Sequence, residues 1–253
     1  MEKQDIMQEF FDQMIAFTTK IKNEERERIE AVAKIIADQI EKDKLIYIWG
    51  PGGHSNMNAM EIFFRAGGLM HVSAILDEGT MISSGALRSM AIERTPGYGR
   101  IVIDDNKIGK DDLLIIANAY GINAACLDAA FRAKELGATT VAVTSTSHAD
   151  NIPADHPARH PSKQNLYKVC DYYIDTKVPV GDAVITIPGI DQKMGAVSTL
   201  CNAYTLNCLM MIAAQILGER KVEVPLWKSG NCPGGDEWNN RFISRFKGKV
   251  KLM

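Results

Sequence analysis

The stretch Leu45-Ile-Tyr-Ile-Trp49, followed by Gly50-Pro-Gly-Gly-His-Ser55, is an apolar strand-like run and a glycine-bearing turn that leads into a helix-like run. Leu113-Leu-Ile-Ile-Ala117 and Asn118-Ala-Tyr-Gly121 repeat this layout. In a parallel α/β sheet, the layout places backbone N–H groups and a helix N-terminus at the carboxyl end of a strand, where anionic or polyhydroxylated ligands bind. We therefore expect the two loops to form one composite small-molecule site.

Five apolar runs predict the strands of one sheet, and they span residues 45–49, 70–76, 113–117, 139–144 and 171–175. Helical patterns lie between most of these runs. Near-continuous apolar strands that alternate with helices are typical of a parallel sheet covered on both faces. The sequence therefore predicts an α/β fold in the form of a three-layer αβα sandwich.

The segments before and between these strands have their own predicted structure. Residues 2–42 show helical periodicity in two pieces that break near Asn23, so we expect helices before the sheet. Residues 77–110 form a longer insertion with a short helix around 86–94. Residues 145–165 read as a long irregular loop, and loops of that length are often functional.

The composition is that of an ordinary globular protein. Of 253 residues, 46% are hydrophobic and 24% are charged, which suffices for one substantial core. A formal net charge of -2 excludes a strong nucleic-acid footprint, and the basic tail 241–251 reads as solvated. We expect a single domain with N-terminal helices (1–42), an αβα core (43–218) and a C-terminal extension (219–253).

The cysteines favour a reducing compartment. Five cysteines form no CxxC pair, and Cys126, Cys170 and Cys201 lie in apolar runs, so we expect buried free thiols in a cytoplasmic protein. The chain opens on no leader pattern. Segment 194–218 has no charged residue but several polar ones, so we expect a buried or interface helix and no membrane span.

The first glycine loop offers backbone and side-chain contacts for a ligand. Gly52 and Gly53 let the backbone approach a ligand closely, and Ser55 either caps the following helix or donates its hydroxyl to substrate. The spacing fails the dinucleotide fingerprint, and no Walker lysine follows. A tight turn without a ligand is the alternative interpretation.

Glu61 lies on the helix that follows the first loop. Met57, Met60 and Phe64 mark an apolar stripe on that helix, and Glu61 falls on its edge. A carboxylate held partly away from water has a raised proton affinity, which suits a general base. We expect Glu61 to be a catalytic base, the alternative being an ordinary boundary glutamate.

The second loop supplies two amides and a phenol. Asn118, Tyr120 and Asn123 are candidate ligand contacts around Gly121. Asn123 could equally cap the helix that begins at Ala124. Both loops thus combine backbone donors with polar side chains, and each has a purely structural alternative.

The histidines show no metal-site spacing, so we expect no metal and no other cofactor. His148, His156 and His160 share one loop, from which one of them could act as an acid or base; a solvated loop histidine is the alternative.

A polar stripe runs along the uncharged segment 194–218. Ser198, Asn202 and Thr205 repeat at helical spacing, so they share one face of an otherwise apolar helix. That face could border the ligand or pair across a subunit interface, and we expect the interface.

Several segments taken together resemble one known family, the sugar isomerase (SIS) domain family, over roughly residues 30–218. The segments are Ile48-Trp-Gly-Pro-Gly-Gly-His-Ser55, Arg65-Ala-Gly-Gly68, Ile92-Glu-Arg94 with Gly97-Tyr98, Asp112-Leu-Leu-Ile-Ile-Ala117, Thr144-Ser145 with His148, Gly181-Asp182 and Gly234-Gly-Asp-Glu237. The flanking helices and tail resemble a subgroup often labelled as phosphoheptose isomerases.

The resemblance implies a flavodoxin-like, five-stranded parallel sheet and a homodimer or homotetramer that pairs through its helices. It implies binding of a sugar or sugar phosphate and aldose–ketose isomerisation through an enediol, with a carboxylate base. Phosphoheptose isomerases carry this base on the helix after the first glycine loop, about one turn beyond the place of Glu61. The expected site has Glu61 and His54 as catalytic residues and, as substrate-binding residues, Gly52, Gly53, Ser55, Asn118, Tyr120, Gly121, Asn123, Ser145 and His148.

Two features depart from the family's pattern. Asn118-Ala-Tyr-Gly-Ile-Asn123 replaces the phosphate-binding Ser-x-Ser-Gly-x-Thr, so a differently charged or uncharged sugar becomes credible. The last core helix lacks the histidine that serves phosphoheptose isomerases as second acid/base, so His54 or the 148–160 loop is a candidate for that role. In the tail, Trp238 stands where the subgroup has histidine.

Three functions agree with these patterns. The first is a sugar or sugar-phosphate isomerase of carbohydrate metabolism. The second is a non-catalytic carbohydrate-derivative binding or sensor protein, although no helix-turn-helix is appended as in a DNA-binding regulator. The third is a lyase or etherase that acts on a substituted sugar through the same carboxylate.

Overall fold

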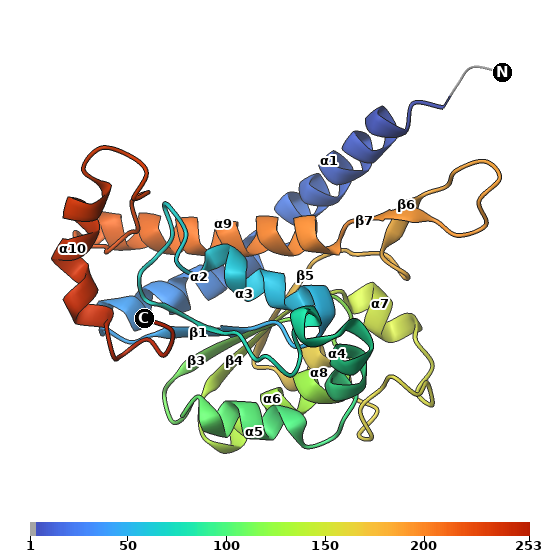
Figure 1. The fold of residues 1–253 in the computed structure, drawn as a ribbon, viewed down its shortest axis with the longest axis horizontal. Helices are drawn as coiled ribbons and strands as arrows, with labels where there is room; N and C mark the ends of the chain where they lie inside the picture. Colours follow the sequence, from blue (N-terminus) through green and yellow to red (C-terminus); the bar gives the residue numbers. More distant parts are fainter. Residues whose placement is uncertain (1–3) are drawn as a thin grey trace.

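The computed structural model describes residues 4–253 and arranges them around one five-stranded parallel sheet (Figure 1). The strands are β1 (Ile46–Trp49), β2 (Val72–Ile75), β3 (Leu113–Ala117), β4 (Thr139–Thr144) and β5 (Tyr172–Asp175). Their order across the sheet is β2-β1-β3-β4-β5, which is the flavodoxin-like order. The five predicted apolar runs are thus the five strands, and the predicted α/β sandwich is confirmed.

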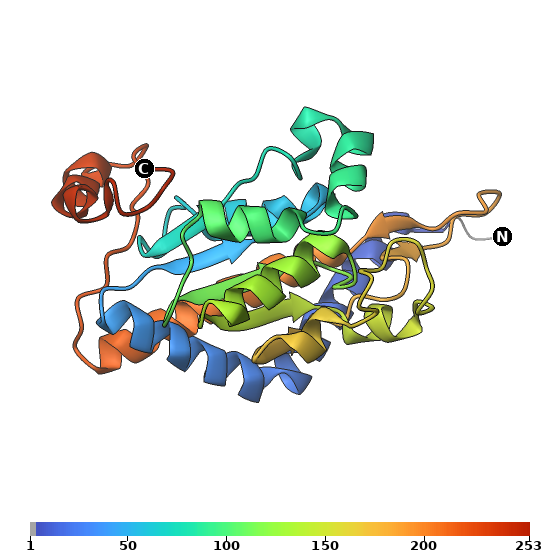
Figure 2. The same ribbon diagram turned by 90° about the horizontal axis from the view of Figure 1, so that it is seen from below.

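Helices cover both faces of this sheet (Figure 2). One face carries α2 (Arg26–Glu41), α3 (Asn56–Ile62) and α9 (Ser198–Glu219), and α1 (Ile6–Glu24) extends beyond it. The other face carries α5 (Tyr98–Asp105), α6 (Ala124–Glu135) and α8 (Leu166–Val169), with α4 (Ala86–Glu93) against α6. The remaining helices are α7 (Thr146–Asn151), after β4, and α10 (Gly235–Phe246), beyond the C-terminal end of α9.

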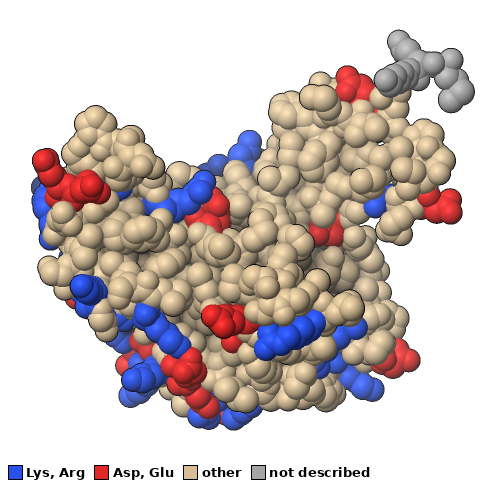
Figure 3. Space-filling view, in the orientation of Figure 1, with Lys and Arg blue, Asp and Glu red and all other residues tan. Residues whose placement is uncertain are grey.

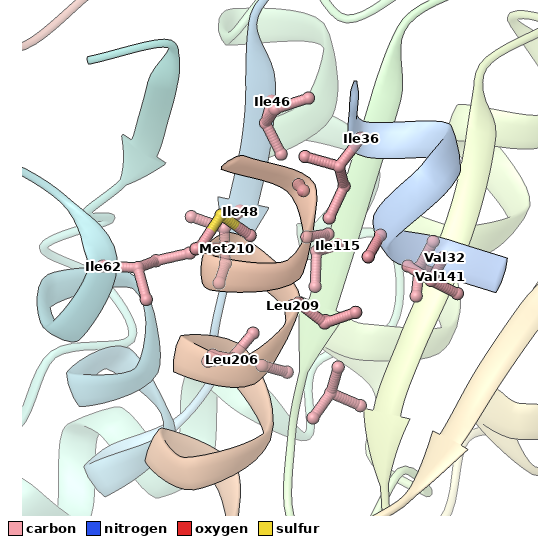
Figure 4. Packing of buried hydrophobic residues seen from close by; sticks show 14 of the residues in the cluster. Val32, Ile36, Ile46, Ile48, Ile62, Ile115, Val141, Leu206, Leu209 and Met210 are labelled. Carbon is pink, nitrogen blue, oxygen red and sulfur yellow. The ribbon is translucent and has the colours of Figure 1, made fainter. Parts of the chain in front are cut away.

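Alternation along the strands builds two separate cores. In β1, Ile46 and Ile48 join the cluster under α2 and α9, whereas Trp49 joins the cluster under α5 and α6. Figure 4 shows the first cluster, in which Leu209 of α9 and Ile36 of α2 pack toward the strands. Side chains of a strand point alternately to opposite faces, so a strand buried on both sides must be apolar throughout.

The order of the strands reverses at β1. Strand β1 pairs with β2 on one side and with β3 on the other, and both pairings are parallel. The loops that follow β1 and β3 therefore leave the same edge of the sheet at a topological switch point, which is where open α/β sheets bind ligands.

Some elements differ from the sequence-based expectation. The break between α1 and α2 falls at Glu25, because this residue is 1% exposed and its carboxylate pairs with Lys177 at 2.6 Å. The insertion 77–110 holds a second helix, α5, and residues 146–151 of the predicted loop form α7.

Two further elements were not predicted. The hairpin of β6 (Ala183–Ile185) and β7 (Met194–Ala196) has strands too short to show periodicity, and β7 occupies the start of segment 194–218, for which we predicted a helix. Helix α10 packs Phe242 and Phe246 into a third apolar cluster. This cluster attaches the C-terminal extension to the core.

Helix α9 is the uncharged helix predicted from segment 194–218. It begins at Ser198, and Leu206, Leu209 and Ala213 are buried against the rest of the protein. Among the described residues it is the one helix with the length and mean hydropathy, 1.4, of a membrane span, a criterion that core helices also meet. Its packing against α2 and α3 identifies it as a core helix here.

Candidate functional site

A cleft of about 290 Å³ lies at the carboxyl end of the sheet. Both predicted loops, the end of α4, the β6–β7 hairpin region and the start of α9 contribute to its wall. The lining residues are Gly52, Gly53, His54, Ser55, Asn58, Glu93, Asn118, Ala119, Tyr120, Asn123, Asp182, Ala196, Ser198, Thr199 and Asn202. The structure thus brings the two glycine loops together as one composite cleft.

Asn118 fastens the two loops to each other. Its side-chain Nδ2 donates to the Pro51 carbonyl at 2.7 Å and to Ser55 Oγ at 3.3 Å. Its Oδ1 accepts from the N–H groups of Tyr120 at 3.1 Å and Gly121 at 2.8 Å. The amide of Asn118 is therefore occupied by the protein itself, although the residue lines the cleft.

The other polar side chains of the second loop are held from the adjacent segments. Asn123 makes no cap bond to α6 and donates instead to the Ala158 carbonyl at 3.1 Å. The ring of Tyr120 stacks on His148 with centroids 3.9 Å apart. Burial lowers the pKa of His148 to about 4, so this imidazole is neutral near pH 7.

Three of the expected substrate contacts lie behind the cleft wall. Gly121 is buried and contributes its N–H to the Asn118 turn. Ser145 is fully buried, and its hydroxyl donates to the Val178 carbonyl and accepts from the His148 N–H. His148 is buried and supports the Tyr120 ring. These three residues are not part of the cleft lining, and they support the loop that forms its wall.

Glu93 lies at the C-terminal end of α4, and its mostly buried carboxylate side chain lines the cleft. Its Oε2 lies 1.7 Å from the position that a Cβ atom on Gly52 would occupy, so the carboxylate rests directly on that glycine. No side-chain hydrogen bond holds Glu93 within residues 4–253. Burial raises the pKa of Glu93 to about 7, against a smaller opposing effect of Arg94.

A second carboxylate, Asp182, closes the far side of the cleft. Its Oδ1 accepts from the N–H groups of Val197 at 2.9 Å and Ser198 at 2.8 Å, and its Oδ2 accepts from Ser198 Oγ at 2.6 Å. The positive end of α9 therefore stabilises this carboxylate, which fixes the first turn of α9 in place. Thr199, the next residue of α9, and Asn202, one helical turn after Ser198, line the cleft.

Glu61 lies in a different hollow of the protein. The hollow has a volume of about 350 Å³, and Met210, Met211 and Leu226 are among its lining residues. There Glu61 Oε1 accepts from Asn207 Nδ2 at 3.2 Å and pairs with Arg65 Nε at 3.3 Å. The structure thus separates the expected base from the two loops.

The apolar stripe predicted for α3 faces outward. Met57, Met60 and Phe64 are 42%, 47% and 64% exposed. The buried side of α3 carries Asn58 and Ala59, because the helix passes close to β3 and Asn58 Nδ2 donates to the Ala117 carbonyl at 3.1 Å. The assumption that apolar residues mark the buried face was wrong for this helix.

The polar residues of the cleft include Asn58, Glu93 and Asp182, to which the sequence assigned no role. Asn58 was missed because the apolar stripe of α3 predicted the opposite face of that helix to be buried. Glu93 and Asp182 lie in two of the segments that carry the family resemblance, so a signal for them was present. Ser198 and Asn202 of the predicted polar stripe of α9 line the cleft, in agreement with the alternative that the stripe borders a ligand, whereas Thr205 is buried.

The raised pKa of Glu93 predicts a pH-dependent cost to stability. Its folded-state pKa of about 7 exceeds the ordinary 4.5, so the folded state holds the proton more tightly and stability falls as pH rises between these values. We expect Glu93→Gln to raise the free energy of unfolding by about 1–2 kcal/mol more at about pH 8 than at about pH 5. Urea titrations at both pH values test this, and an equal effect at both would contradict it.

No group of three or more His, Cys, Asp or Glu side chains is arranged for a metal ion anywhere in residues 4–253. The five cysteines are free, and Cys126, Cys170 and Cys201 are buried, as predicted. The polar groups of the cleft are therefore amides, hydroxyls, one imidazole and two carboxylates.

Comparisons with known proteins agree with this architecture. The SIS domain family model matches residues 9–145. A UPF0309 protein of Streptomyces griseus subsp. griseus is 31% identical over 96% of this chain and 95% of its own length, and one of Geobacillus thermodenitrificans is 33% identical over 90% of each. The structure of a phosphoheptose isomerase from Francisella tularensis shares the fold with a TM-score of 0.55 and 15% identity, covering 83% of this chain and 97% of that one. Because the family model matches more than half of the chain and the relatives align over nearly all of it, the chain belongs to the SIS domain family.

Proposed function

We propose that the cleft binds a sugar or a related carbohydrate derivative and catalyses aldose–ketose isomerisation, with Glu93 as the base. The observation that carries the proposal is the position of Glu93, a mostly buried carboxylate on Gly52 in a cleft otherwise lined by amides and hydroxyls. Polyhydroxylated ligands match such a lining, because each hydroxyl can pair with an amide or hydroxyl group.

The acid–base properties of Glu93 suit this chemistry. A general base works best with a pKa near the operating pH, because enough of it is ionised and it still binds the proton well. Burial places Glu93 there, with a pKa of about 7. Since no other side chain bonds this carboxylate within residues 4–253, it remains available to a ligand.

The proposed reaction moves one proton between adjacent carbons. Glu93 removes the proton from C2 of the aldose, which gives an enediol, and returns it to C1 to give the ketose. The C1 carbonyl oxygen gains a proton as the enediol forms, and the C2 hydroxyl gives up its proton as the C2 carbonyl forms, so that atoms and charge balance. The cleft offers Ser55, Tyr120, Thr199 and His54 for these transfers between oxygens. His54 keeps the second acid/base role predicted for it, because it lines the cleft and is exposed to solvent.

Product analysis tests the class of reaction. Incubation of the protein with aldoses and ketoses, free and phosphorylated, should give the paired isomer at unchanged mass, and mass spectrometry with chromatography would detect it. A product of lower mass would indicate a lyase or etherase instead. Ligand binding without any product would favour a sensor.

We also propose that the chain is at least a homodimer in the cytoplasm, where its free cysteines would stay reduced. The support is exposed apolar surface on the α1, α3 and α9 layer. On α1, Met7 is 85% exposed and Phe11 is 51% exposed, and on α9, Met211 is 62% exposed. Figure 3 shows mostly uncharged surface where α1 and the β6–β7 hairpin extend from the body. Contiguous apolar surface of this kind is typical of subunit contacts.

Charge substitutions test this assembly. Wild type should elute in size-exclusion chromatography with light scattering at twice the chain mass or more, and Phe11→Asp should shift it toward the monomer. Ile101→Asp is the matched control, since Ile101 is 65% exposed but lies on α5, on the other side of the sheet. A monomeric wild type, or equal dissociation by both variants, would contradict the proposal.

A further inference from the structure

The cleft presents hydrogen-bond acceptors that no protein group uses. Asn202 of α9 is 2% exposed, and its Oδ1 is buried without a hydrogen-bond partner while the residue lines the cleft. An unpaired buried amide oxygen is costly and therefore uncommon in folded proteins. The atom is closed to water in this structure, so a ligand hydroxyl would reach it through a small rotation of the Asn202 side chain, and a hydrogen bond there would remove that cost. Glu93 adds a carboxylate that is likewise free of side-chain hydrogen bonds within residues 4–253.

Two backbone donors of the second loop that could hold an anion are already in use. Asn118 Oδ1 accepts from the Tyr120 and Gly121 N–H groups, so an amide oxygen occupies this turn. At the start of α9, the Asp182 carboxylate occupies the N–H groups of Val197 and Ser198. Side-chain oxygen atoms of the protein thus accept from the N–H groups of the Asn118 turn and of the start of α9.

The charges of the cleft agree with this pattern. Its lining residues within 4–253 include two carboxylates, Glu93 and Asp182, and neither a lysine nor an arginine. An ionised phosphate in the same cleft would lie near like charge without a cationic partner. The first turn of α6, which has no side-chain cap, could bind either a hydroxyl or a phosphate oxygen and so does not discriminate.

We infer that the ligand of this cleft is an unphosphorylated sugar, one of whose hydroxyl groups donates a hydrogen bond to Asn202 Oδ1. The inference rests on the proposed function and narrows its substrate class. A hydroxyl of a free or a phosphorylated sugar can donate to the amide oxygen, so Asn202 selects for a sugar, and the argument against a phosphate group rests on the two carboxylates and the lack of a lysine or arginine in the lining. Asn202 is then a specificity-determining residue.

Paired ligands test the inference. Saturation-transfer NMR and calorimetry would compare aldohexoses and ketohexoses with their own 6-phosphates, with inorganic phosphate as competitor. We expect at least one free sugar to bind, its 6-phosphate to bind about tenfold more weakly or worse, and millimolar inorganic phosphate not to compete. A 6-phosphate that binds more tightly than its parent sugar, or a panel in which no free sugar binds, would overturn the inference.

Variants at Asn202 locate the contact. Asn202→Leu should weaken binding of that free sugar about three- to tenfold, the effect of one neutral hydrogen bond, and should leave the melting temperature at or above that of wild type. Asn240→Leu is the control, because Asn240 is exposed on α10, far along the chain from the cleft-lining residues. Unchanged sugar affinity in a folded Asn202→Leu protein would overturn the assignment.

The isomerase proposal and the inference of an unphosphorylated sugar can fail independently of each other. If 6-phosphates are isomerised and Glu93→Gln abolishes their turnover, the isomerase proposal stands and the inference about the free sugar fails. If free sugars bind through Asn202 but no isomer forms, the inference stands and the isomerase proposal fails.

Discussion

Glu93→Gln should lower the rate of isomerisation about a thousandfold, because the amide cannot accept the substrate proton and general-base catalysis contributes about this much. The substitution is nearly isosteric, and Glu93 has no side-chain hydrogen bond within residues 4–253 whose loss would disturb the fold. The variant should therefore be folded, bind the sugar and fail in the proton transfer. Time courses of isomer formation for wild type and variant measure the effect.

Glu61→Gln is the matched comparison. Glu61 is also a glutamate near a helix C-terminus, and its carboxylate pairs with Asn207 and Arg65 in the second hollow. We expect Glu61→Gln to retain nearly all of the activity. If instead Glu61→Gln abolishes isomerisation and Glu93→Gln leaves it intact, the base is the residue favoured by the sequence and the assignment to Glu93 is wrong.

Gly52→Ala should lower the isomerisation rate about a hundredfold, because misplacing a catalytic group by about 1 Å costs this much. The added Cβ atom would lie 1.7 Å from Glu93 Oε2 and 3.0 Å from its Cδ. The carboxylate is the flexible end of a side chain, so it would move aside and the protein would still fold. Kinetics and thermal melts on the same sample separate these two effects.

Gly67→Ala isolates the backbone cost of such a substitution. Gly67 has a φ of +80°, close to the +97° of Gly52, but nothing lies within 4 Å of the Cβ that alanine would add. Both variants should lose stability from their positive φ, Gly52→Ala by about 1–3 kcal/mol because its ψ of 144° lies where glycine alone is common, and only Gly52→Ala should lose activity. Equal activity in the two variants would show that Glu93 does not act from its place on Gly52.

The sheet and its ligand-binding edge could be predicted from the sequence because burial on both faces makes strands apolar throughout. The runs at 45–49 and 113–117 had no competing interpretation, and their glycine loops marked the switch point. In contrast, α5 and α10 were not predicted although both are amphipathic. In α10, Trp238, Phe242 and Phe246 recur every four residues, a signal in the sequence from which we drew no prediction.

The sequence pattern and the structure favour different carboxylates as the base, for a physical reason. A helix usually buries its apolar stripe, and this rule pointed to Glu61 as a half-buried carboxylate. Helix α3 buries Asn58 instead, and its methionines remain on the outer surface of the chain. Glu93 reaches the cleft only because α4 folds back over Gly52, a long-range contact that no local pattern encodes.

Deuterium uptake from D2O at C1 or C2 of the sugar, followed by NMR, tests the central claim most directly. The panel would contain aldoses and ketoses with and without phosphate, incubated with wild type, Glu93→Gln and Glu61→Gln. The account predicts uptake from at least one sugar with wild type and Glu61→Gln and none with Glu93→Gln. While the enediol is bound, protonated Glu93 exchanges its proton for deuterium from solvent and then delivers deuterium to the sugar carbon. Uptake that persists in Glu93→Gln, or no uptake from any sugar that binds to the wild-type cleft, would contradict it.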